Sequence, residues 1–164
     1  MPLGIKLTAF GYENLMQGLL KVSKEGVVET LTTEAGGLKF QLTDGVDVAD
    51  DGTVYFTDAS SKYRLHNFIF DMLEGRPLGR LLRYDPTTKT TELLVGDLYF
   101  ANGVVVAPSQ DFVVFCETPL YVFFDCLNKS IEHKIDSLRS LKIAGEDVEN
   151  ITLPEIAKEA LRNS

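Results

Sequence analysis

The side chains of this chain that could carry chemistry are scattered, and few have a suitable neighbour. His66 and His133 lie in segments with helical spacing and have no partner pattern nearby, so we expect both to be surface or packing residues. Ser60 and Ser61 lack both the glycine pattern of a nucleophile elbow and a paired histidine. The sequence also lacks a phosphate-binding glycine loop and the ligand spacing of a zinc site. A serine hydrolase, a nucleotide-binding enzyme and a zinc enzyme are therefore not indicated.

Cysteine and asparagine side chains offer covalent chemistry instead. Cys116 and Cys126 could form a disulfide, but a pair is too few for a disulfide framework. Because Cys116 falls inside a predicted strand, we expect it to be a buried free thiol. Asn128 and Asn150 each begin an Asn-X-Ser/Thr sequon, so both are glycosylation candidates if the chain enters the secretory route.

Composition excludes several classes of partner. The chain has 164 residues, 45% of them hydrophobic, and a formal net charge of −8. Nucleic-acid binding and docking on anionic membranes need a basic footprint, and the sequence contains none. No apolar run reaches the roughly 18 residues that span a membrane. The N-terminal segment MPLGIKLTAFGYENL is a poor match to a signal peptide. We expect a globular protein that binds neither nucleic acid nor membrane.

The elements that would position any site come from an internal repeat. Residues 18–58 and 79–117 resemble each other, with an aligned Leu-Leu pair, an Asp-Gly-Val or Asn-Gly-Val step, and an apolar run that ends in an acid. Each copy holds four strand-like runs: 18–22, 27–32, 45–49 and 53–58, then 80–84, 90–95, 103–107 and 112–117. Short strands repeating at this period predict a β-propeller.

Helices are predicted between the copies and after them. Residues 63–75 carry apolar side chains at spacings of three and four, with Ser60 or Ser61 as the cap and Gly75 at the end. After about residue 118 the repeat stops, and helices are predicted over 131–141 and 154–163. We therefore divide the chain into a β-rich part, 1–118, and a divergent, partly helical tail, 119–164.

An ordered series of motifs resembles the strictosidine synthase-like family. The series runs DGTVYFTD, SSKY, GRLLRYDP, FANGV and CET, from Asp51 to Thr118. With Asp44 and a weaker match at Gly18–Val22, the resemblance takes in about three-fifths of the chain. The family is similar to paraoxonases and gluconolactonases, which implies a six-bladed propeller. In that frame residues 44–95 form one blade, 18–32 the outer half of the blade before it, and 102–117 the inner half of the blade after it.

Six blades need roughly 250–300 residues, so we expect a mainly β, partial propeller of about two antiparallel four-stranded blades. Open sheet edges of such a fragment are expected to self-associate.

The resemblance also implies an activity. Strictosidine synthases condense an amine with an aldehyde, forming a carbon–nitrogen bond in biosynthesis, and a glutamate on a late blade handles the protons. No residue here corresponds to that glutamate, so we assign no catalytic residue and expect the chain by itself to be inactive. Glu117 matches a different family glutamate and is expected to bond to neighbouring backbone. Small-molecule pocket positions carried over from the family are Leu42, Asp44, Tyr63, Phe100, Asn102 and Thr118.

Two alternatives remain open. In the paraoxonases and gluconolactonases a calcium or similar ion polarises an ester or lactone carbonyl. Asn102 resembles one of their ligands and Asp44 lies next to another, but calcium takes about six to eight oxygens, so no metal and no cofactor is expected here. The other alternative is a non-catalytic, truncated binding form.

The resemblance also implies a compartment. Family members usually reside in the vacuole or elsewhere in the endomembrane system.

Overall fold

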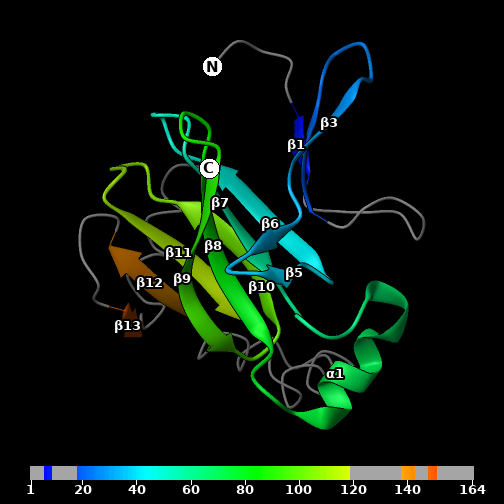
Figure 1. Cartoon of the computed structure of the whole chain (residues 1–164). Coiled ribbons are helices and arrows are strands. Elements are labelled where there is room, and N and C mark those ends of the chain that lie inside the picture. Colours follow the sequence, from blue (N-terminus) through cyan, green and yellow to red (C-terminus); the bar gives the residue numbers. More distant parts are fainter. Residues whose placement is uncertain (1–5, 9–17, 119–137, 143–147, 151–164) are drawn as a thin grey trace.

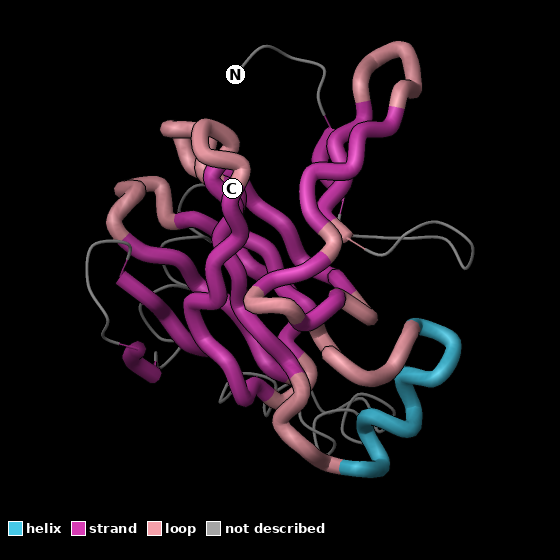
Figure 2. Tube along the Cα trace, viewed as in Figure 1, coloured by secondary structure: helices cyan, strands magenta, loops and turns pink. Residues whose placement is uncertain are grey.

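Short antiparallel strands, ordered as meanders, dominate the computed structural model of the chain (Figure 1). It describes residues 6–8, 18–118, 138–142 and 148–150. Two four-stranded sheets lie side by side, a hairpin projects at the top of the view, and the helical segment lies at the bottom (Figure 2). The sheets are successive blades of a partial propeller, as the repeat predicts.

The first complete blade contains β6 (Thr43–Val48), β7 (Val54–Asp58), β8 (Gly79–Asp85) and β9 (Thr90–Leu98). These strands pair antiparallel in chain order, which confirms residues 44–95 as one blade. Strand β7 is buried along its whole length. Successive side chains of a strand face opposite ways, so Tyr55 joins one apolar core while Val54 and Phe56 join the other. A neighbouring layer therefore covers each face of this blade.

The second blade contains β10 (Ala101–Val106), β11 (Phe112–Glu117), β12 (Leu138–Lys142) and β13 (Val148–Asn150). The helix predicted over 131–141 is wrong in its described part, because Leu138–Lys142 pairs with β11 as a strand. Apolar residues at 135, 138 and 141 fit a helical period, but the free edge of β11 offers a complete ladder of backbone partners. His133, Cys126, Asn128 and the helix predicted over 154–163 lie outside the described residues.

A three-stranded sheet precedes the first complete blade. It contains β1 (Lys6–Thr8), β2 (Leu19–Val22) and β3 (Val28–Thr32), and a small hairpin of β4 (Glu34–Ala35) and β5 (Leu38–Lys39) follows. Strand β2 lies between β1 and β3, and both pairings are antiparallel. The predicted strand pair in residues 18–32 is thus confirmed.

The innermost strands of the two blades, β6 and β10, pack closely together. A Cβ atom on Gly45 would lie 2.7 Å from the Asn102 carbonyl oxygen, so a side chain there would collide with the β10 backbone. Asp47 accepts a hydrogen bond from the Val106 N–H at 2.8 Å, and the Thr57 hydroxyl donates to the Asn102 carbonyl at 2.5 Å. Backbone proximity and side-chain bonds together fix one blade against the next.

The helical segment is shorter than predicted. It consists of η1 (Leu65–Asn67) and α1 (Phe68–Glu74), and it ends where expected, at Gly75 in the left-handed conformation (φ 60°). Its start differs, because Ser60 accepts hydrogen bonds from the N–H groups of Lys62 and Tyr63 and so caps a turn ahead of the helix. Among the described residues, no helix has the length and apolar character needed to cross a membrane.

The buried face of α1 also differs from the apolar face that the spacing suggests. Asp71 and Met72 are buried, whereas the apolar side chains of Leu65, Ile69 and Leu73 are exposed. The segment is therefore held by a few contacts at one face rather than by a continuous apolar stripe.

Candidate functional site

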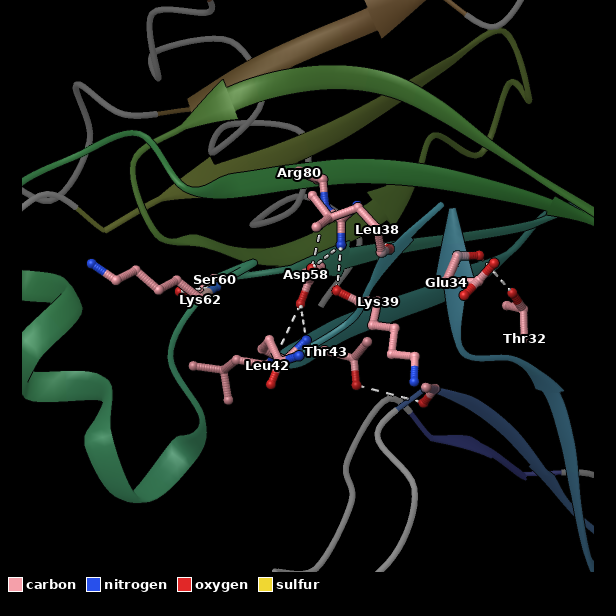
Figure 3. Close-up of polar contacts among 12 residues, drawn as sticks. Thr32, Glu34, Leu38, Lys39, Leu42, Thr43, Asp58, Ser60, Lys62 and Arg80 are labelled. Atoms are coloured by element: carbon pink, nitrogen blue, oxygen red, sulfur yellow. Dashed lines mark hydrogen bonds and ion pairs between the residues drawn. The ribbon is translucent and has the colours of Figure 1, made fainter. Parts of the chain in front are cut away.

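A buried ion pair fixes the backbone that leads into β6. Arg80 on β8 donates to Asp58 Oδ2 on β7 through Nη2 at 2.6 Å and through Nε at 3.2 Å (Figure 3). The Arg80 side chain is 8% exposed and the Asp58 side chain 0%. Burial raises the pKa of Asp58, while the Arg80 guanidinium acts in the opposite direction. Charges this deep persist because each is hydrogen-bonded to the other.

The same pair holds the segment before β6 by its main chain. Arg80 donates to the carbonyl oxygens of Leu38 and Lys39, and Asp58 Oδ1 accepts from the N–H groups of Gln41 and Leu42 at 3.3 and 3.0 Å. Figure 3 shows these bonds converging from both sides on Asp58. Leu42 is consequently buried, with 7% of its surface exposed. This arrangement sets where β6 begins and so where Asp44 lies.

Asp44 and Asn102 occupy matching bulges on the two innermost strands. The pairing register shifts between Thr43 and Val46 on β6 and between Ala101 and Val104 on β10. Both residues thus lie within strands. An extra residue in a strand redirects side chains, and such bulges are common beside binding sites.

The environment of Asp44 is half-buried and acidic. Burial raises the pKa of the Asp44 carboxyl. The Cys116 thiol is free and half-buried, and burial, with a smaller effect from Asp44, raises its pKa as well. A protonated thiol is a poor nucleophile, so Cys116 is a packing group, as the sequence predicts.

Phe100, Asn102 and Thr118 form a hydrogen-bonded corner at the end of the second blade. The Asn102 Nδ2 donates to Thr118 Oγ1 at 3.2 Å, and the Thr118 N–H bonds to the carbonyl oxygens of Tyr99 and Phe100. Phe100 is held in the left-handed region (φ 50°), which is costly for a residue with a Cβ atom. Glu117 accepts from the Tyr99 N–H at 2.6 Å, which confirms its expected backbone bond.

A small, shallow depression lies between this corner and α1. Its lining combines an acid, a base and a hydroxyl with apolar and aromatic groups: Asp71, Met72, Gly75, Arg76, Tyr99, Phe100 and Thr118. The rings of Phe100 and Phe68 approach with centroids 6.4 Å apart, so α1 closes one side. The depression thus joins the inserted helix to the start of β10.

A polar cluster ties α1 to the loop that precedes it. Glu74 Oε2 accepts from the Lys62 ammonium at 2.7 Å and from the Tyr63 hydroxyl at 2.6 Å, and its Oε1 pairs with Arg76 at 3.3 Å. These bonds, with Lys62 first, lower the pKa of Glu74 to about 2. Tyr63 therefore helps to hold the helix in place through its bond to Glu74.

The candidates from the sequence divide into two groups. Phe100 and Thr118 line the depression, and Asn102 bonds directly to Thr118. Asp44 lies on the neighbouring strand β6, which packs against β10. Leu42 and Tyr63 are outside the set of described residues that line the depression.

Three site residues were missed: Asp58, Arg80 and Asp71. A signal existed for two of them, because Asp58 shares a strand face with apolar residues of β7 and Arg80 shares one with apolar residues of β8. Asp71 lies off the apolar face of the predicted helix, so nothing in the sequence signalled it.

The oxygen ligands at this end of the blades are too few for calcium. Within the described residues, no group of three or more His, Cys, Asp or Glu side chains could hold a metal ion. Asp44 and Asn102 supply two side-chain oxygen donors where calcium takes about six to eight. The described residues thus do not fit a calcium site by themselves. What they offer is a half-buried carboxyl, an amide and a hydroxyl beside an aromatic wall.

Known proteins resemble this chain in sequence. The family described as Strictosidine synthase matches residues 44–125. Protein STRICTOSIDINE SYNTHASE-LIKE 7 of Arabidopsis thaliana is 53% identical over 123 residues, which is 73% of this chain and 33% of that protein. STRICTOSIDINE SYNTHASE-LIKE 6 of the same plant is 54% identical over 123 residues, again covering 73% of this chain and 33% of the relative. The chain thus spans about a third of the length of these curated relatives.

The fold resembles that of a solved enzyme structure. A gluconolactonase from Xanthomonas campestris superimposes with a TM-score of 0.56 and 16% sequence identity, covering 84% of this chain and 42% of that one. At this sequence identity, the superposition shows a shared fold and gives no information about activity.

Proposed function

The chain belongs to the strictosidine synthase-like family, and from this premise we propose that it forms the small-molecule-binding part of a propeller whose whole-protein activity is amine–aldehyde condensation. The observation that carries the proposal is the corner of Phe100, Asn102 and Thr118 beside the Asp44 bulge. Asp44 and Asn102 lie on the two innermost strands, which pack together, and Phe100 and Thr118 line the depression beside them.

The reaction explains why such a site is useful. The amine nitrogen attacks the aldehyde carbon, the resulting carbinolamine loses water, and an iminium ion forms. Water leaves only after its oxygen gains a proton, so the site must hold both reactants while an acid/base group exchanges protons. We assign the described residues to the holding role and expect the acid/base group to come from elsewhere in a whole family protein.

The test combines binding with turnover. The purified chain is mixed with tryptamine and an aldehyde, condensation is followed by mass spectrometry, and binding by shifts of backbone amide NMR signals. We expect the signals of Gly45 and Asn102 to shift while condensation stays at the buffer rate.

The matched variants are Asp44→Asn, which keeps the shape but removes the half-buried charge, and Asp50→Asn, which removes an exposed charge. Asp44→Asn should reduce the binding shifts, and Asp50→Asn should leave them unchanged. Condensation well above the buffer rate would refute the division of roles, and unshifted signals at Gly45 and Asn102 would refute the binding site.

A second candidate function is metal-dependent hydrolysis of an ester or lactone. It is favoured by the positions of Asp44 and Asn102 in matching bulges on adjacent innermost strands. Calcium would then need further ligands from the whole protein, where it would polarise the carbonyl. Hydrolysis of phenyl acetate that is abolished by a chelator and restored by calcium would favour this candidate over condensation.

For the compartment of the whole protein we propose the vacuole or another endomembrane compartment, as in the family. Asn128 and Asn150 would then be available for glycosylation. The protein isolated from its natural source should lose mass on treatment with a peptide-N-glycosidase, and an unchanged mass would contradict their modification.

A further inference from the structure

Thr57 stands opposite the bulge of β6. In the pairing of β6 with β7, two residues of β6, Asp44 and Gly45, face the single residue Thr57 on β7. An extra residue in a strand leaves a backbone group without a partner in the ladder. Here the Gly45 N–H donates instead to the hydroxyl oxygen of Thr57, Oγ1, at 2.9 Å. A side chain thus completes the hydrogen bonding of the bulge.

The same hydroxyl also reaches the second blade. Thr57 Oγ1 donates to the Asn102 carbonyl oxygen at 2.5 Å, and Asn102 lies in the bulge of β10. Thr57 has 0% of its surface exposed, so water does not compete for either bond. One oxygen atom therefore holds the peptide group that follows Asp44 and the peptide group that follows Asn102.

A hydroxyl suits this place because it carries one proton and two lone pairs, so it can accept from an N–H group while it donates to a carbonyl. Hydrogen bonds linked in this way polarise and strengthen each other in a buried setting. The two strands come close enough for the bridge because residue 45 is glycine: a Cβ atom there would lie 2.7 Å from the Asn102 carbonyl oxygen. The bridge therefore depends on the hydroxyl of Thr57 and on the bare backbone of Gly45.

The second blade uses the same position differently. Asn102 and Gly103 in the bulge of β10 face Cys116 on β11, which is thus the counterpart of Thr57. The Cys116 thiol donates to the Gly103 carbonyl of its own blade at 3.7 Å, and a thiol is a weak donor. A residue opposite a bulge can therefore serve its own blade alone, and the link across blades is a property of Thr57.

We propose that Thr57 is a positioning residue of the candidate site: its hydroxyl fixes Asp44 relative to Asn102, so that one small molecule can contact both side chains. The inference rests on the proposed function in one respect, because Asp44 and Asn102 belong to the proposed binding site. Removing the hydroxyl keeps both side chains and loosens their relative placement.

Three substitutions of Thr57 separate the hydroxyl from the space that the side chain fills. Thr57→Val keeps the shape and removes the hydroxyl, Thr57→Ser keeps the hydroxyl, and Thr57→Cys supplies the weak donor of the second blade. Thr91→Val is the matched control, because the Thr91 hydroxyl bonds to Thr32 between outer strands at 2.8 Å. Should Thr57→Val not fold, Thr57→Cys gives the same comparison with a weakened donor.

The bridge is first measured without a ligand. Hydrogen exchange reports the Gly45 amide, and its reference is the Ala49 amide, which donates to the Thr53 carbonyl at 2.9 Å in the same strand pair. We expect Gly45 to exchange at least about tenfold faster in Thr57→Val, while Ala49 and both hydroxyl-preserving and control variants stay near the wild type. The carbonyl ¹³C signal of Asn102 should shift upfield in Thr57→Val, because that oxygen loses a donor. A Gly45 amide that speeds up no more than Ala49, or an unmoved Asn102 signal, would overturn the positioning role.

The ligand test uses tryptamine, which is titrated into the full chain and read from the Gly45 and Asn102 amide signals. We expect Thr57→Val to bind about tenfold more weakly, Thr57→Cys to lie between, and Thr57→Ser and Thr91→Val to bind within about threefold of the wild type. Equal binding by Thr57→Val would overturn the role of the hydroxyl in the site. A wild type that binds no tryptamine would refute the proposed function, whereas the ligand-free signals decide by themselves whether Thr57 fixes Asp44 against Asn102.

Discussion

At the scale of single residues, charges in apolar surroundings decide the geometry of the candidate site. Asp58 and Arg80 form hydrogen bonds to each other and to four main-chain groups. These bonds offset the cost of desolvating the two charges and fix the place where β6 begins. Asp71 is the opposite case, since one of its oxygens is left without a donor among the described residues. A satisfied buried charge positions the chain, and an unsatisfied one costs stability.

Removing one member of the buried pair should destabilise the fold strongly. Arg80→Met leaves Asp58 as an uncompensated buried charge, so the free energy of unfolding should fall by about 3–5 kcal/mol. Arg83→Met breaks the exposed pair with Glu92 and should cost about 0–1 kcal/mol. Urea unfolding of both variants measures the contrast. Equal small losses would show that the pair does not hold the segment before β6.

Asp71→Asn should stabilise the chain in a pH-dependent way. Burial raises the pKa of Asp71 in the fold, so ionising it costs more in the folded than in the unfolded state. That cost is absent below the unfolded pKa of 3.8, grows as the pH rises from there toward the raised pKa of the folded state, and is complete above it. The melting temperature of Asp71→Asn should thus exceed that of the wild type at about pH 7, with the two converging below about pH 3.5. A gap that widened toward acid would contradict the raised pKa.

At the scale of elements, bulges and one short helix place the site. The bulge at Asp44 and the bulge at Asn102 repeat the same Gly-containing step on adjacent innermost strands. The helix α1 is too short to be stable by itself. It depends on the Gly75 cap and on the bonds that Glu74 makes with Lys62 and Tyr63.

Gly45→Ala should force β6 and β10 apart. The added Cβ would lie 2.7 Å from a β10 carbonyl oxygen and 2.8 Å from the Val104 nitrogen, which belong to backbone that cannot rotate away. We expect a loss of about 1–3 kcal/mol in the free energy of unfolding. Gly96→Ala is the control, because its nearest neighbour would be a Leu93 side-chain carbon at 3.8 Å. Similar stabilities of the two variants would argue against close packing of the innermost strands.

The cluster around Glu74 should weaken in acid. The pKa of Glu74 in the fold is about 2 against an ordinary value of 4.5, so the stability that it contributes is complete above about pH 5 and is lost as the pH falls toward 2. Hydrogen exchange of the α1 amides should therefore be faster in Glu74→Gln than in the wild type at about pH 7, and the difference should vanish near pH 2. Exchange unaffected by the substitution at pH 7 would show that the cluster does not hold the helix.

At the scale of the whole molecule, the described residues form two four-stranded blades with a third sheet beside them. The chain spans about a third of the length of its curated relatives, so condensation, substrate and compartment are proposals for a whole protein.

Unpaired strand edges and exposed apolar residues decide whether the chain associates with other copies in solution. In the described part of the chain, β3 pairs on one side, with β2, and Val28 on it is 52% exposed.

Association through this edge is the whole-molecule prediction. An exposed apolar edge strand is a template for pairing with a second copy, so the sedimentation coefficient should rise with protein concentration. Val28→Lys should reduce this rise, because it replaces apolar surface with charge. Thr30→Lys adds the same charge on the same strand without removing apolar surface and should reduce it less. A wild-type chain that sediments as a monomer at every concentration would contradict the prediction.

The repeat in the sequence was sufficient to predict the blades. Alternating apolar residues and turn-forming links are local signals for a strand, so the eight strands predicted within 18–117 lie within a few residues of their observed places. The short hairpin of β4 and β5 was not predicted. Phe100, Asn102 and Thr118 were named as pocket positions through the family resemblance. The structure brings Asn102 and Thr118 within hydrogen-bonding distance, and their role in a pocket stays a prediction.

Tertiary structure alone decided the rest, because it depends on partners distant in the chain. Leu138–Lys142 has helical spacing but becomes a strand, since the edge of β11 is there to pair with it. Arg80 reaches Asp58 and Leu38 across 22 and 42 residues, and such contacts leave no local periodicity. Local pattern thus determined which segments are strands, and burial and distant pairing determined which polar side chains form the site.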